Sequence, residues 1–116
     1  MQAREISNVI AELRDEGHDP MVRLAENVSK QSWARALKYD LSMLRLWIAR
    51  KTVASAELMI TYGDGRGGGR PLRMDRDVFD LTIFEAGRGV ETRALTMTEA
   101  IERIGAWFEE MGRRAP

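Results

Sequence analysis

The chain contains no cysteine and a single histidine, His18, among its 116 residues. Without cysteine it can form no disulfide, no thiolate nucleophile and no cysteine-ligated zinc site. A lone histidine is a poor metal-site candidate, and no nucleophile-elbow sequence accompanies it. We therefore expect no catalytic residue, no metal site and no cofactor, and we expect His18 to cap or cover the corner at Gly17.

The chain also lacks an excess of charge of either sign and a long apolar run. It has 18 Lys and Arg against 18 Asp and Glu, a net charge of zero, which indicates neither a strongly basic nucleic-acid binder nor an acidic mimic of DNA. No segment approaches the roughly 18 consecutive apolar residues of a membrane-spanning helix, and the N-terminal sequence is amphipathic and acidic rather than a signal peptide. We expect a cytoplasmic protein with no membrane partner.

A chain of 116 residues predicts a single domain, residues 1–116, of the α+β class. Residues 1–54 are expected to be helical, with two or three helices. Residues 55–96 are expected to form a three-stranded antiparallel meander with a Gly-rich loop at 63–70, and residues 97–112 a C-terminal helix. The predicted order is ααα-βββ-α, with the helices packed on one face of the sheet.

Residues 32–53 form the longest stretch that reads as one helix, without glycine or proline. At 100° per residue its apolar positions form a wide stripe, with Trp33, Leu37, Leu41, Leu44 and Ile48 at its centre. An arc this wide exceeds what one neighbouring element covers, so other elements or a partner should wrap it. Within it, Trp47 with Leu46 and Met43 is the best candidate for an exposed patch that meets a partner.

Two shorter helices are predicted before this stretch. The apolar spacing of residues 3–16 is helical, and Gly17 is the expected stop. Asp19 followed by Pro20 predicts the start of a second helix, with Asp19 as its N-cap.

After residue 54 the apolar period changes from 3.6 to 2. Alternation predicts strands over residues 55–62, 78–85 and 90–95, and the connection at 86–89 contains two glycines suited to a tight turn. The sequence Thr96-Met97-Thr98-Glu99 fits a capping box, so it predicts the start of the last helix.

The Gly-rich segment has five glycines between positions 63 and 69 and literally matches the G-x-G-x-x-G pattern. A dinucleotide site needs a helix to begin directly after that pattern, but Pro71 and a strand-like segment follow it. No Lys followed by Ser or Thr ends the run, so it is not a P-loop either. We expect a flexible, solvated hairpin loop.

Six cations are candidates for contacts with a partner. Three lie in or after the Gly-rich loop and three on the polar strip of the predicted long helix: Arg66, Arg70, Arg73, Arg35, Lys38 and Arg45. Flexible Arg/Gly segments can follow a phosphate backbone or close on a protein. If the loop and the strip share a side, the molecule has a basic surface despite its zero net charge.

These features favour a small, non-enzymatic protein-binding module, an adaptor or an inhibitor that docks on a larger protein complex. Small proteins of phages and other mobile elements, including inhibitors of bacterial defence systems, have this size and α-plus-β build, although no motif in this chain carries the likeness. The expected partner is another protein or complex, or a second copy of the chain. The alternative is a nucleic-acid-binding module that uses the Arg/Gly loop and the basic strip.

Overall fold

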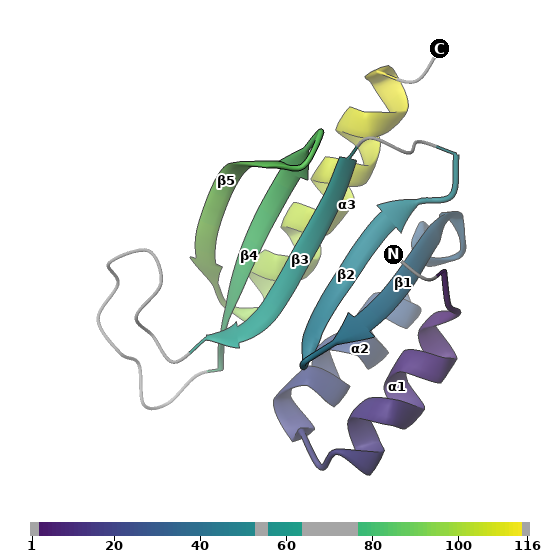
Figure 1. Ribbon diagram of the computed structural model, residues 1–116, viewed down its shortest axis with the longest axis vertical. Helices are drawn as coiled ribbons and strands as arrows, with labels where there is room; N and C mark the ends of the chain where they lie inside the picture. The colour runs from purple at the N-terminus through teal and green to yellow at the C-terminus, as the bar shows by residue number, and fades with distance from the viewer. Residues whose placement is uncertain (1–2, 53–55, 64–76, 115–116) are drawn as a thin grey trace.

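The computed structural model describes residues 3–52, 56–63 and 77–114 of the chain. The elements follow in the order α1 (Ile6–Asp15), α2 (Asp19–Ser29), a short 3-10 helix η1 (Ala34–Ala36), β1 (Leu37–Ser42), β2 (Arg45–Arg50), β3 (Ala56–Gly63), β4 (Val78–Glu85), β5 (Arg88–Leu95) and α3 (Met97–Arg114). The five strands form one antiparallel sheet in the order β1-β2-β3-β4-β5, with α2 and α3 crossing behind it in Figure 1. In the described part of the chain, no helix is long and apolar enough to cross a membrane.

The α+β class, the antiparallel sheet and the succession of N-terminal helices, sheet and C-terminal helix are confirmed, but the predicted number of strands is wrong. The sheet has five strands instead of three, and the described residues follow the order αα-βββββ-α. The difference lies in residues 32–53, which form η1 and the β1–β2 hairpin instead of a long helix. The described residues 32–52 therefore contain no wide helical apolar arc that a partner would have to cover.

The β1–β2 hairpin forms because its apolar residues also alternate with period 2. Leu37 and Tyr39 are buried while Lys38 and Asp40 are more accessible, as in a half-buried strand. Tyr39 pairs directly with Ile48 of β2, and both are buried in the core.

The turn of this hairpin has an unusual backbone. Ser42 pairs with Arg45, so Met43 and Leu44 form a two-residue loop, and their φ angles are +52° and +61°. Two positive φ angles define a type I′ turn, which favours Asn-Gly because non-glycine residues are strained there. The predicted tight turn between β4 and β5 is confirmed at Ala86 and Gly87, with φ angles of +51° and +78°.

The helix ends largely follow the predicted signals. Gly17 has φ of +70° and ends the first helix, as expected. The N-cap of α2 is His18 rather than Asp19, since the His18 Nδ1 accepts a hydrogen bond from the Met21 amide at 3.4 Å. The capping box of α3 is confirmed. The Glu99 amide donates to the Thr96 hydroxyl at 3.3 Å, and the Thr96 amide donates to the Glu99 carboxylate at 2.9 Å.

The hydrophobic core lies between the helices and one face of the sheet. Its largest fully buried side chains are Trp107, Tyr39 and Phe79. The Tyr39 hydroxyl donates a hydrogen bond to the Ala34 carbonyl at 2.9 Å, and burial raises the pKa of Tyr39 well above its ordinary value. Side chains from all three helices belong to this one cluster, so the helices cover the same face of the sheet.

The two edges of the sheet differ. Beside β1, Arg4 exchanges two backbone hydrogen bonds with Tyr39, at 2.8 and 3.1 Å, which covers part of that edge. In the described part of the chain, β5 pairs only with β4. Figure 1 shows β5 at one margin of the sheet and β1 at the other.

A substitution in the β1–β2 turn tests the strain there. We expect the Met43→Asn/Leu44→Gly double variant to raise the free energy of unfolding by about 1–2 kcal/mol, because Asn-Gly is the favoured sequence for a type I′ turn. Urea denaturation measures the change. Ala86→Asn, which creates Asn-Gly in the other tight turn, is the matched positive control. A destabilised double variant beside a stabilised Ala86→Asn would contradict the strain argument.

The contact between β5 and α3 predicts a dependence of stability on pH. Arg103 donates to both Glu91 oxygens, at 2.7 and 3.2 Å, and holds the pKa of Glu91 below its ordinary value. The ion pair therefore stabilises the fold at neutral pH, and this contribution is lost as the pH falls through the lowered pKa of folded Glu91.

We expect Glu91→Gln to lower the free energy of unfolding by about 1 kcal/mol at pH 7, and the difference from the wild type to vanish in acid. Chemical denaturation across the acidic range measures it. Glu102→Gln, at an exposed position of α3, should leave stability unchanged throughout. A Glu91→Gln deficit that persists at low pH would point to lost packing instead of lost charge.

Candidate functional site

In the part of the chain that the structure describes, one face of the sheet has no helix packed on it. Cross-strand pairing places one row of side chains on this open face: Asp40, Trp47, Met59, Thr82 and Thr92. Their neighbours along each strand point to the opposite, buried face. The row crosses all five strands, so the open face is continuous from β1 to β5.

An apolar cluster occupies the middle of the open face. The rings of Trp47 on β2 and Phe84 on β4 lie 5.5 Å apart between centroids, tilted by 37°. Because β3 lies between these strands, the rings meet above β3, beside Met59. All three side chains are partly exposed, while Ala49 beside them is 2% exposed. We call Trp47, Met59 and Phe84 the open-face cluster.

Charged side chains surround the open-face cluster. The cross-strand pairs place two cations and three carboxylates on this face: Lys38, Arg45, Asp40, Glu57 and Asp80. Their formal charges sum to −1. The surface is therefore an apolar centre with a mixed, slightly acidic rim.

The tip of the β1–β2 hairpin adds two exposed apolar residues. Met43 is 84% exposed and Leu44 is 37% exposed. The tip connects directly to Arg45 and Trp47 of the open face. Tyr62, which is 38% exposed, lies at the same end of the sheet. Leu46 of β2 pairs with Ile60 of β3, and Tyr62 follows Ile60 by two residues in the direction of the hairpin tip.

Only some of the sequence-predicted partner residues come together. Trp47 does lie on an accessible surface, although on a strand instead of a helix. Arg35 lies in η1, Lys38 in β1 and Arg45 at the start of β2, so they do not form the predicted basic helix strip. Lys38 and Arg45 share the open face at opposite ends of the hairpin. Arg66, Arg70 and Arg73 fall outside the described residues.

The sequence reading missed Met59 and Phe84 as parts of a site. A signal existed, because alternation within the predicted strands 55–62 and 78–85 places both residues on the same side as their polar neighbours. An apolar residue on the polar side of two neighbouring strands marks an accessible apolar cluster.

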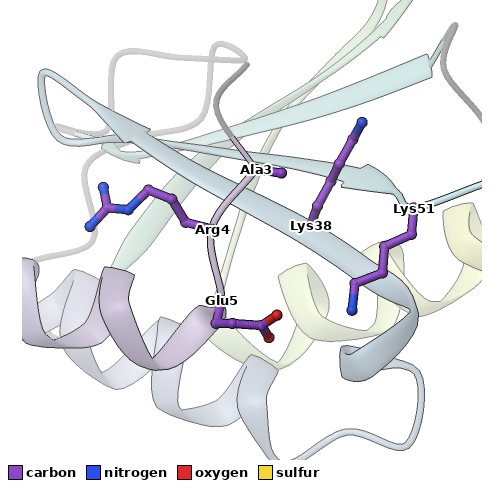
Figure 2. A pocket seen from close by; sticks show the side chains of 5 residues that line it. All are labelled: Ala3, Arg4, Glu5, Lys38 and Lys51. Carbon is purple, nitrogen blue, oxygen red and sulfur yellow. The ribbon is translucent and has the colours of Figure 1, made fainter.

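A cavity of about 360 Å³ lies beside β1, where the N-terminal segment pairs with it. Its lining residues are Ala3, Arg4, Glu5, Lys38 and Lys51. Figure 2 shows the charged ends of Arg4, Lys38 and Lys51 pointing in different directions. The Arg4 guanidinium is paired with Glu12 at 3.0 Å. These cations do not converge on one point, so the cavity is a poor anion site.

His18 and its neighbours form a polar cluster where α2 meets the ends of β3 and β4. Arg23 donates to one Asp77 oxygen at 2.7 Å and Tyr62 donates to the other at 3.0 Å, and these hydrogen bonds, chiefly that of Arg23, hold the pKa of Asp77 below its ordinary value. The His18 ring packs edge-on against Tyr62, and its Nδ1 caps α2. Each group already has a structural partner. Among the residues the structure describes, no three His, Asp or Glu side chains gather as a metal site requires.

Comparisons with protein-family models, with curated proteins and with solved structures find no match to this chain. The interpretation of the open face therefore depends on its geometry and chemistry.

Proposed function

We propose that this protein is a non-enzymatic protein-binding module, an adaptor or inhibitor that docks on a larger protein or complex in the cytoplasm. Its docking surface is the open face of the sheet, centred on Trp47, Met59 and Phe84, together with the Met43–Leu44 tip of the β1–β2 hairpin.

The observation that carries the proposal is the combination of strain and exposure at the tip. Met43 and Leu44 both hold positive φ angles, at a cost of roughly 1–2 kcal/mol per residue. Met43 is 84% exposed and Leu44 37% exposed, so burial offsets little of this cost for Met43 and only part of it for Leu44. A strained apolar tip in solvent is consistent with a role in contact with a partner.

The composition of the open face supports the same conclusion. Trp, Phe and Met are enriched in the centres of protein interfaces, where charged residues are depleted and form a rim instead. The open-face cluster and its surrounding charges have this arrangement. A partner that supplies an apolar patch with charges of both signs at its edge would match it.

The size of the open face limits the mode of binding. With strands about 4.8 Å apart and residues about 3.3 Å apart along each strand, five strands of this length offer roughly 500 Å². A stable interface buries about 800 Å² on each side. The face alone is therefore too small, and the Met43–Leu44 tip is a natural extension of it.

One observation favours the alternative of a nucleic-acid-binding module. Aromatic side chains on an uncovered sheet can stack on the bases of single-stranded RNA or DNA. The described cations weigh against it, because Lys38 and Arg45 lie at opposite ends of the hairpin and form no continuous basic strip for a phosphate backbone. We therefore favour a protein partner.

Site-specific photo-crosslinking tests the proposal. A photoreactive amino acid is placed at Trp47 or Met43 in cells of the source organism, with Ser7, exposed on α1, as the control position. We expect the same protein adduct from positions 47 and 43 and none from position 7. Nucleic-acid adducts from position 47 would establish the alternative, and no adduct from either position would contradict both.

Once the adduct is identified, paired phenylalanine substitutions measure the contribution of the open face. We expect Phe84→Ala to weaken binding by about 2 kcal/mol, roughly thirtyfold, because Phe84 belongs to the proposed centre of the interface. Phe108→Ala is the matched control, since Phe108 lies on α3, behind the sheet, against Arg50. Calorimetry measures both. Equal losses for the two variants would contradict docking on the open face.

A further inference from the structure

The outer edge of β5 is a surface that the proposed docking function does not use. In the described part of the chain, β5 hydrogen-bonds to β4 on one side and to no strand on the other. Its sequence, RGVETRAL, contains no proline or lysine, the residues that commonly protect an edge. A bulge lies where β5 passes Phe84, and pairing is regular from Glu91 to Leu95.

We propose that β5 pairs antiparallel with β5 of a second copy of this chain, with Thr92 opposite Thr92, to form a ten-stranded sheet. The two-fold axis is perpendicular to the sheet. The helices of both copies then lie on one face, and the two open faces join on the other.

The charges on β5 select this register. Directly opposite residues must lie on the same face of the sheet, so the axis passes through a residue, and the regular residues nearest the middle of β5 are Glu91, Thr92 and Arg93. A centre at Glu91 places two carboxylates opposite each other, and a centre at Arg93 places two guanidinium groups opposite each other. Both arrangements are unfavourable. A centre at Thr92 instead places Glu91 of each copy opposite Arg93 of the other.

The existing contacts of these residues fit the pairing. Arg93 contacts Glu91 of its own strand at 3.2 Å, yet its side chain remains 56% exposed. Glu91 is held in place by Arg103 of α3 at 2.7 Å. The carboxylate is therefore fixed at the edge, and the flexible arginine of a second copy can reach it.

The uncharged residues of the edge fit as well. The Thr82 and Thr92 hydroxyl oxygens lie 3.4 Å apart, so a second Thr92 would extend this threonine pair across the axis. The bulge at Val90 confines the regular pairing to the residues around Thr92. Such a short pairing predicts a weak, concentration-dependent dimer.

Because the chain contains no cysteine, a single introduced cysteine reports the pairing directly. Residues opposite each other in an antiparallel pair have Cα atoms about 4.5–5.5 Å apart, within the range that a disulfide spans. We expect Thr92→Cys to oxidise to a disulfide dimer, while Thr98→Cys, exposed on α3, does not. Absence of the Thr92→Cys dimer, or equal oxidation of both variants, would overturn the proposal.

Sedimentation of the full chain provides a second measurement. We expect the mass to rise from 13.2 kDa toward twice that value between about 1 µM and about 1 mM protein. Arg93→Glu should raise the dissociation constant at least about tenfold, because two attractive pairs become repulsive. Arg113→Glu, the same change at an exposed position of α3, should leave it unaltered. A monomer at all concentrations, or equal effects of the two variants, would exclude this pairing.

The dimer and the docking function can fail separately. The disulfide and sedimentation experiments contain no other macromolecule, so a negative result leaves the open face as a docking surface. Partner binding by Phe84→Ala is measured separately from dimer formation, so its loss says nothing about the β5 edge.

Discussion

The packing of three helices on one face of the sheet determines which side chains remain on the surface. Each strand alternates, so covering one face buries residues such as Leu58, Ile60 and Leu81 and leaves the opposite set accessible. The helices provide no cover for Trp47, Met59 or Phe84, and these side chains shield one another only in part. The candidate site is thus a consequence of one-sided packing, and it would not exist if a second layer covered the sheet.

The β1–β2 hairpin connects this architecture to the proposed function. Its strands are held by buried pairs such as Tyr39 with Ile48, which fix the register without help from the turn. The fold therefore tolerates residues in the turn that are unfavourable at positive φ angles. Met43 and Leu44 occupy positions where Asn-Gly would be more stable, and a stabilised fold with a polar tip is readily accessible by mutation. Stability alone does not account for the residues found there.

The positions of β3, β4, β5 and α3 could be predicted from the sequence, whereas β1 and β2 were predicted as a helix. The predictable elements have clear signals, namely strict alternation, the glycine of the Ala86–Gly87 turn and the capping box at Thr96. The hairpin has none, because no Gly, Asn or Pro marks the turn at Met43–Leu44. Leu37, Leu41 and Ile48 also satisfy both helical and strand periods, so periodicity could not decide between them. The open-face cluster depends on the strand conformation of β2, because Trp47 lies opposite Met59 only when β2 pairs with β3. A helix over residues 32–53 does not predict this cluster.

The two surfaces meet at Thr92, which ends the row of side chains that crosses the open face. A single open face of roughly 500 Å² supports only weak binding. Pairing of two copies through β5 would join two such faces on one rigid sheet, with a Met43–Leu44 tip toward each far end. A partner that is itself two-fold symmetric could then bind both faces, and the second contact would form at a high effective concentration. Weak docking and weak pairing would each strengthen the other, because a partner that binds both faces also stabilises the dimer.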